Sequence, residues 1–140
     1  ILLNADNGLT ATNTIAGNYI GLGADGRTPV PIRGFDVYYQ GTGIQLQWNS
    51  QNTVIGGTTT AARNVIGGNE GHGIRIWNYP GFTAAHDNTV IGNYIGTDAT
   101  GSTLVPNQRS GIELSGGTFN NIIGGLDSTR RNVISGNTMY

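Results

Sequence analysis

The sequence predicts an all-β chain that winds into a solenoid of parallel strands with three faces and about four coils. The first observation is that a short aliphatic segment flanked by Asn or Gly recurs twelve times in 140 residues. The second is that these segments are of three kinds, which follow one another in strict rotation. The third is that no window of the sequence shows a helical period.

The first kind of strand carries two aliphatic side chains separated by one other residue. It occurs at residues 1–3, 43–46, 73–76 and 111–114. Because side chains alternate along a strand, Ile74 and Ile76 are expected to point inward and Arg75 outward. Arg75 and Glu113 occupy the same position in successive coils, where they would form either an exposed ion pair or two separately solvated charges.

The second and third kinds of strand each begin with Asn. The second kind lies at residues 13–15, 52–55, 88–91 and 120–123, and the third at 18–21, 64–67, 93–96 and 132–135. They predict two structural columns of stacked asparagines, namely Asn13, Asn52, Asn88 and Asn120, and Asn18, Asn64, Asn93 and Asn132. Such amides hydrogen-bond to neighbouring backbone and to their equivalents in adjacent coils. The glycines after the second strands are expected at sharp corners, and they are Gly17, Gly56, Gly92 and Gly124.

Each group of three strands forms one coil of a single domain, residues 1–140. The expected coils cover about residues 1–43, 44–73, 74–110 and 111–140. Coils one and three carry their insertion after the third strand, whereas coils two and four carry it between the second and third strands. The repeating unit is therefore a pair of coils, roughly 70 residues long.

Parts of the sequence resemble a known family. Residues 88–101, 123–125 and 131–137 resemble the right-handed parallel β-helix repeats of large secreted and surface proteins of bacteria and archaea. The resemblance implies a right-handed parallel β-helix in an extracellular or cell-surface protein. Most such repeats are architectural or adhesive stalks, although related helices also carry polysaccharide lyases and hydrolases. The resemblance therefore indicates the fold more specifically than the activity.

Composition argues against several classes of function. Charged residues make up 11% of the chain, the net charge is −1, and Lys and Cys are absent. A nucleic-acid partner would require a concentrated basic surface, and no apolar run approaches the roughly 20 residues of a membrane span. Residue 1 already lies in a strand, which indicates a processed product, an excised fragment or a sequence that begins in mid-chain.

No group of residues predicts catalysis or a metal centre. A glycosidase needs two carboxyl groups roughly 5–10 Å apart, and no pair in the predicted fold meets that demand. Asp25 and Asp98 lie in corresponding loops and are expected to support turns beside nearby glycines. His72 and His86 have no second ligand at metal-binding spacing. No cofactor is therefore predicted, although a single calcium ion held in a turn stays open.

Aromatic residues are the candidates for ligand binding or for lateral contacts. They lie in the longest insertion or just after first strands, and they are Phe35, Tyr38, Tyr39, Trp48, Trp77, Tyr79 and Phe82. Exposed aromatic rings bind sugars or protein surfaces, so polysaccharide is a candidate partner. The alternatives are that these rings cover the barrel or pack laterally against another chain.

The ends of the predicted solenoid give the main functional hypothesis. A solenoid needs caps, because an uncapped coil exposes unpaired backbone groups and a hydrophobic core, yet no capping segment is evident. The expected end-to-end interface consists of Ile1, Leu2, Leu3, Ile112, Leu114, Val133, Ile134, Met139 and Tyr140. We expect a structural subunit of an extracellular fibre that stacks head to tail with copies of itself. The alternatives are a stalk fragment of a larger surface adhesin and a carbohydrate-binding or polysaccharide-degrading module.

Overall fold

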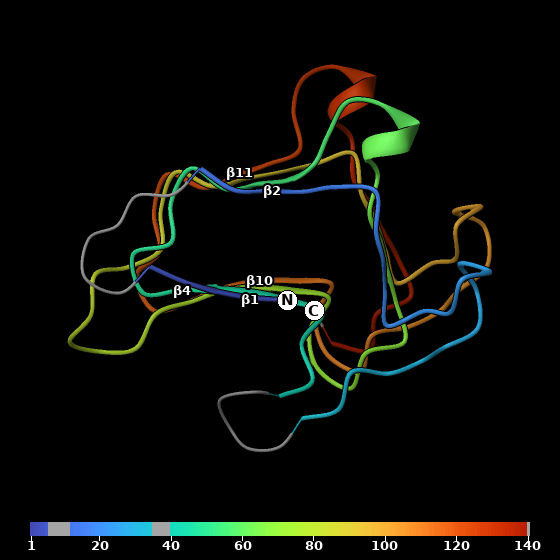
Figure 1. Cartoon of the computed structure of the whole chain (residues 1–140), viewed down its shortest axis with the longest axis horizontal. Helices are drawn as coiled ribbons and strands as arrows, with labels where there is room; N and C mark the ends of the chain where they lie inside the picture. Colours follow the sequence, from blue (N-terminus) through green and yellow to red (C-terminus); the bar gives the residue numbers. More distant parts are fainter. Residues whose placement is uncertain (6–11, 35–39, 140) are drawn as a thin grey trace.

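The computed structural model describes residues 1–5, 12–34 and 40–139, and these residues contain twelve short strands (Figure 1). The strands are β1 (Leu2–Asn4), β2 (Thr14–Ile15), β3 (Tyr19–Ile20), β4 (Ile44–Gln47), β5 (Val54–Gly56), β6 (Val65–Ile66), β7 (Ile74–Ile76), β8 (Thr89–Ile91), β9 (Tyr94–Ile95), β10 (Ile112–Leu114), β11 (Ile122–Ile123) and β12 (Val133–Ile134). They coincide with the twelve segments that the sequence predicts.

The strands form three parallel four-stranded sheets. The first sheet has the order β1-β4-β7-β10, the second β2-β5-β8-β11 and the third β3-β6-β9-β12. Each successive set of three strands is one coil and contributes one strand to every sheet, as the stacked turns in Figure 1 show. The predicted fold class is confirmed: the chain is a three-faced parallel β-helix of about four coils.

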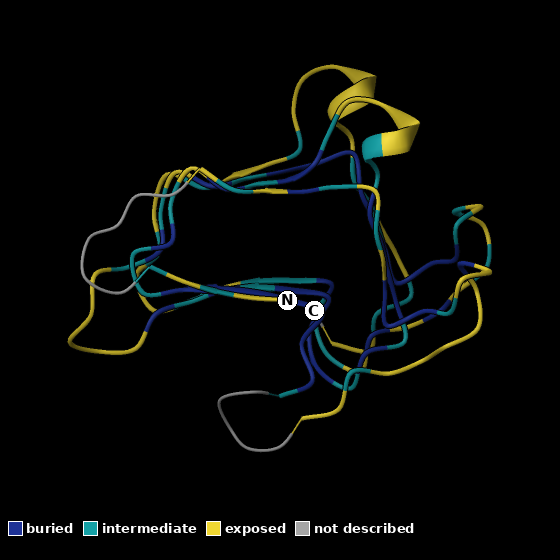
Figure 2. Ribbon diagram, in the orientation of Figure 1, coloured by how far each residue is buried: buried dark blue, intermediate teal, exposed yellow. Residues whose placement is uncertain are grey.

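Aliphatic side chains from all three sheets meet inside the coils. Eight of them are completely buried, and they are Ile44, Leu46, Ile55, Ile66, Ile74, Ile76, Val90 and Ile95. All eight belong to coils two and three, which have a coil on each side. Figure 2 shows buried residues along the strands and exposed residues in the projecting loops. Burying one such side chain contributes about 1.5–3 kcal/mol to the stability of the fold. Because the completely buried side chains lie in the two middle coils, these coils supply most of the stabilisation from the core.

The parallel register also settles the question of Arg75 and Glu113. These residues pair directly in β7 and β10, and the distance from Arg75 Nε to Glu113 Oε2 is 2.6 Å. They therefore form an ion pair rather than two separate solvated charges.

The corner glycines adopt the backbone conformation expected of them. Gly17, Gly56, Gly92 and Gly124 have φ angles of 72°, 92°, 70° and 83°. This is the left-handed region, which glycine enters without steric cost. Each corner turns the chain from the second sheet toward the third.

One asparagine ladder runs along the third sheet through Asn18, Asn64, Asn93 and Asn132. The Nδ2 group of each residue donates to Oδ1 of the next, over distances of 3.0, 3.0 and 3.1 Å. The backbone N–H of each residue donates to the same oxygen. In Asn64 and Asn93 the amide oxygen thus accepts from the preceding coil, and the amide nitrogen donates to the following one.

The predicted second column of asparagines was wrong by one residue at two positions. Strand register places Asn13, Thr53, Asn88 and Asn121 in this column. Asn88 Nδ2 donates to Asn121 Oδ1 at 2.9 Å, and Thr53 N donates to Asn88 Oδ1. Asn52 and Asn120 lie one residue earlier, with φ angles of 53° and 52°. Asn tolerates this left-handed conformation, so the first Asn of the pair 120–121 forms the bend and the second enters the ladder.

A further ladder was missed at the corner between the third and first sheets. Asn69 Nδ2 donates to Asn107 Oδ1 at 2.8 Å, and Asn107 Nδ2 donates to Asn137 Oδ1 at 2.9 Å. In coil one this column holds Ile32, because Glu70 N donates to Ile32 O just as Gln108 N donates to Asn69 O. Ile32 has no side-chain amide to donate, and buried Asn69 Oδ1 has no partner among the described residues.

The insertions alternate between coil types as predicted. Coils two and four carry short 3₁₀ turns, η2 (Thr60–Ala62) and η3 (Ser128–Arg130), on the outside of the second corner (Figure 1). Coils one and three carry loops after β3 and β9, and these loops contact each other, because Ala99 N donates to Gly26 O at 2.9 Å. Equivalent loops of the two successive coil pairs therefore lie against each other.

The ladder makes stability depend on amides in the middle of the barrel. We expect Asn93→Ala to lower the free energy of unfolding by about 3 kcal/mol, because it leaves buried donors of Asn64 unpaired. Asn18→Ala, at the end of the same ladder, should cost less than about 1 kcal/mol, because water can replace a partly exposed partner. Urea unfolding followed by circular dichroism checks both values. Equal losses would contradict the ladder as described.

Candidate functional site at the open ends of the solenoid

Coil four exposes the side chains that correspond to the buried core of coil two. Ile134 is 46% exposed, whereas its equivalent Ile66 is 0% exposed, and Leu114 is 44% exposed, whereas Leu46 is 0% exposed. Ile122 and Ile123 of β11 are exposed as well. No described coil follows coil four, so its apolar interior and the outer edges of β10, β11 and β12 face solvent.

Coil one forms the opposite end and is only partly open. Ile1 and Leu2 are exposed and Leu3 packs against the core, whereas Ile15 and Ile20 are buried. Tyr19 projects from β3 and is 48% exposed. Of the predicted interface residues, Ile1, Leu2 and Leu3 thus lie at one end, and Ile112, Leu114, Val133, Ile134 and Met139 at the other. Tyr140 lies outside the described residues.

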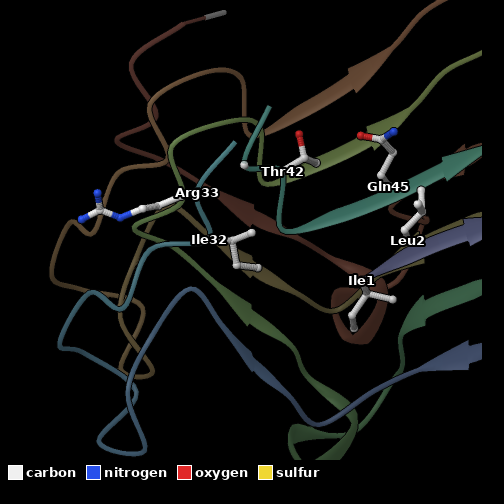
Figure 3. Close-up of a pocket in the computed structure, with 7 residues that line it drawn as sticks. Ile1, Leu2, Ile32, Arg33, Thr42 and Gln45 are labelled. Carbon is white, nitrogen blue, oxygen red and sulfur yellow. The ribbon is translucent and has the colours of Figure 1, made fainter. Parts of the chain in front are cut away.

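A shallow hollow lies at each end, on the corner that leads into the first sheet. The hollow at coil one has a volume of about 240 Å³, and Figure 3 shows Ile1, Ile32 and Thr42 around it. The hollow at coil four has a volume of about 280 Å³ and is lined by Ile112, Ile134 and Met139 among others. The two hollows occupy the same corner of the three-faced barrel, because Ile1 is equivalent to Ile112 and Ile32 is equivalent to Asn137.

The hydrogen-bonding groups of the third-sheet ladder differ between the two ends. At coil one, Asn18 Oδ1 accepts no hydrogen bond from the residues that the structure describes. At coil four, Asn132 Nδ2 donates to Val90 O, and the described chain offers no further Oδ1 for Asn132. One end therefore presents an amide acceptor and the other end presents amide donors.

Four of the predicted aromatic contacts lie in the described part of the chain, and they pack in pairs. Trp48 stacks on Phe82 with ring centroids 5.0 Å apart, and Trp77 meets Tyr79 edge-on at 6.0 Å. Tyr79 and Phe82 are exposed. Phe35, Tyr38 and Tyr39 lie outside the described residues. A stacked pair that the sequence did not indicate, His86 and Phe119, joins coils three and four at 4.8 Å.

Polar side chains gather on the outer face of the first sheet. Glu113 Oε2 lies 2.6 Å from Arg75 Nε and 3.2 Å from His72 Nε2, and the Arg75 guanidinium covers the Trp77 ring. Gln47 Oε1 accepts from Trp77 Nε1 at 2.8 Å. This cluster contains one carboxylate, already paired with Arg75, so it does not supply the two carboxyl groups of a glycosidase.

The loop carboxylates support turns, as the sequence predicts for Asp25 and Asp98. Asp25 accepts from the backbone and hydroxyl of Thr28, and these hydrogen bonds lower its pKa from 3.8 to about 2. Asp98 accepts from Thr100 and Thr103, and its pKa is likewise lowered to about 2. Asp127 caps η3 in the same way. Among residues 1–5, 12–34 and 40–139, no group of three or more His, Asp or Glu side chains could hold a metal ion.

Comparisons with models of protein families, with curated proteins and with solved structures found no match. Within the described ranges, no helix has the length and apolar character needed to cross a membrane. The open ends are the candidate site because they concentrate exposed apolar side chains, strand edges and amide groups in two complementary sets.

The cluster on the first sheet predicts a pH dependence of stability. Burial lowers the pKa of His72 below its ordinary value of 6.5. Arg75 and Arg109 lower this pKa further, whereas the Glu113 carboxylate raises it. Below pH 6.5 the unfolded chain therefore binds a proton that the folded chain resists, so stability should decrease as pH falls from 6.5. Urea midpoints measured between pH 7.5 and pH 5 would check this.

The matched variant is His72→Gln, which keeps a donor near Glu113 but does not titrate. Its urea midpoint should depend less on pH in this window than that of the wild type. The loop aspartates do not interfere, because the pKa shifts of Asp25 and Asp98 act between 3.8 and about 2. Identical pH profiles for both proteins would contradict the assignment to His72.

Proposed function

We propose that the chain is a structural subunit of an extracellular fibre or surface filament, and that copies stack head to tail through the two open ends. The observation that carries the proposal is an internal one. Coils two and three belong to successive coil pairs, and their contact inside the chain has the same order of coil types as a contact between coil four and coil one of a second copy. The chain thus contains a template for the joint.

The internal template has a defined register. Ile44 pairs with Ile74, Val54 with Thr89, Ile55 with Val90, Val65 with Tyr94 and Ile66 with Ile95. Applied to the joint, the same register pairs Ile112 with Ile1, Ile122 with Thr14, Ile123 with Ile15, Val133 with Tyr19 and Ile134 with Ile20. The side chains at most equivalent positions are identical or similar in size. A core that continues through the joint would bury the exposed aliphatic residues of coil four.

Polar groups and shape favour the same arrangement. The amide donors of Asn132 would meet the acceptor Asn18 Oδ1 of a second copy, which continues the ladder in its own direction. The hollows at the two ends would face each other at one corner, with Ile32 of the second copy stacked on Asn137. The unpaired edges of β10, β11 and β12 would be covered by strands rather than left open. Such a contact is heterologous and does not close, so it produces filaments.

The extracellular setting rests on the resemblance to surface β-helix repeats. There are two alternatives. The ends would contact further coils in a larger surface adhesin, or they would stay uncovered in a carbohydrate-binding module. The exposed rings of Tyr79 and Phe82 favour the carbohydrate-binding module as a second candidate.

A pair of matched substitutions tests the proposal. Leu114→Asp should abolish filaments, because it places a charge in the apolar surface that the joint would bury. Leu126→Asp makes the same chemical change in coil four, but on a fully exposed side chain of the projecting insertion, and should leave filaments intact. Electron microscopy of the purified chain should show wild-type fibres with an axial repeat of about 19 Å, four coils at the strand spacing. Monodisperse wild-type particles, or unchanged fibres from Leu114→Asp, would overturn it.

The direction of stacking can be tested separately. Ile1→Asp blocks the coil-one end and Leu114→Asp blocks the coil-four end, and both side chains are partly exposed, so the fold should survive. Each variant alone should be monomeric, whereas a mixture should form one-to-one dimers through the two unblocked ends. Sedimentation velocity distinguishes these species, and circular dichroism verifies folding. Dimers from one variant alone would indicate contact between like ends and contradict head-to-tail stacking.

A further inference from the structure

We infer that Arg131 of one copy and Tyr19 of the next form a latch that favours contact between unlike ends. The inference rests on the proposed head-to-tail function and goes beyond it, because apolar stacking alone does not distinguish coil one of a second copy from its coil four, the other open end. The latch would supply that distinction.

The internal joint contains the prototype of this latch. Arg63 follows η2 in coil two, and its guanidinium carbon lies 4.0 Å from the centroid of the Tyr94 ring in coil three. Arg63 Nε also donates to Gly92 O at 3.3 Å, at the corner that precedes β9. The guanidinium thus holds both a ring and a corner of the following coil, and such cation–π contacts contribute about 0.5–2 kcal/mol.

Arg131 stands in the same position of coil four. It follows η3 as Arg63 follows η2, and each residue donates its backbone N–H to the first residue of its 3₁₀ turn, Ser128 or Thr60. The backbone angles agree within a few degrees, with φ and ψ of −66° and 127° for Arg131 and −63° and 127° for Arg63. Arg131 is exposed, and no described residue lies beneath its guanidinium as Tyr94 lies beneath Arg63.

Tyr19 is prepared in the same way as Tyr94. A β-carbon on Gly26 would lie 2.8 Å from Tyr19 Cζ, and one on Gly101 would lie 2.9 Å from Tyr94 Cζ, so each ring rests against the glycine of its own loop. Tyr19 is nevertheless 48% exposed, and no arginine covers its ring in the described chain. Continuing the internal register brings Arg131 over this ring and its Nε toward Gly17 O.

The latch distinguishes coil types. Tyr occupies this strand position in coils one and three, as Tyr19 and Tyr94, whereas coils two and four have Val65 and Val133. Coil four can therefore place Arg131 on an aromatic ring only if a coil of the first type follows. A joint formed with a coil of the second type would leave the guanidinium over an aliphatic side chain.

The blocked variants allow the latch to be measured at a single joint. The joint in the mixed dimer joins coil four of the Ile1→Asp protein to coil one of the Leu114→Asp protein. Adding Arg131→Ala to the first partner, or Tyr19→Leu to the second, should raise the dissociation constant about tenfold. A dimer that carries both substitutions should have nearly the same dissociation constant as a dimer that carries only one of them. Arg131→Lys, which keeps the charge without the planar group, should weaken the dimer by an intermediate amount.

Two controls isolate the contact. Arg130→Ala in the first partner removes a neighbouring charge of the same coil, which pairs with Asp127, and should change the dissociation constant less than twofold. Arg131→Ala placed on the blocked end of the Leu114→Asp protein should have no effect. If the mixed dimer does not form, the proposed function fails. If it forms and tolerates Arg131→Ala and Tyr19→Leu unchanged, or if their effects simply add, the latch fails while head-to-tail stacking stands.

Discussion

Each of the two middle coils is completed by the coils on either side of it. Strands of two to four residues have too few contacts to be stable alone, and their backbone groups pair only with equivalent strands above and below. The asparagine ladders follow the same rule, because each amide accepts from one neighbour and donates to the other. Burial, strand pairing and side-chain hydrogen bonding are therefore incomplete where the stack ends, which is why exposed aliphatic side chains gather on coil four.

Much of the fold could be predicted because the repeat is local. Strand identity, corner glycines and the alternation of insertions depend on short motifs that recur at recognisable positions. The exact ladder register could not be predicted at Asn120-Asn121, because two adjacent asparagines fit the motif and only backbone conformation separates them. The Asn69 column was missed because insertions of different length separate its members, so no fixed spacing connects Asn107 to Asn69.

The candidate site was predictable in outline and not in its polar detail. Aliphatic residues of the terminal strands indicate an apolar end surface directly from the sequence. The proposed roles of Arg131 and Tyr19 are inferred from the internal pair of Arg63 and Tyr94, which belong to different coils and lie in contact only after folding. His72 beside Glu113 was likewise not foreseen, because it approaches the ion pair from the corner before β7. Motifs that identify a repeat do not show which contacts distinguish one repeat from the next.

The loop contact between coils one and three has a mechanical consequence. The hydrogen bond from Ala99 N to Gly26 O passes outside coil two and ties together two coils that are not neighbours in the sheets. Tension along the solenoid axis would separate coil two from coil one only if this outer tie also yielded. The strands of the barrel and the loops outside it would thus share an axial load.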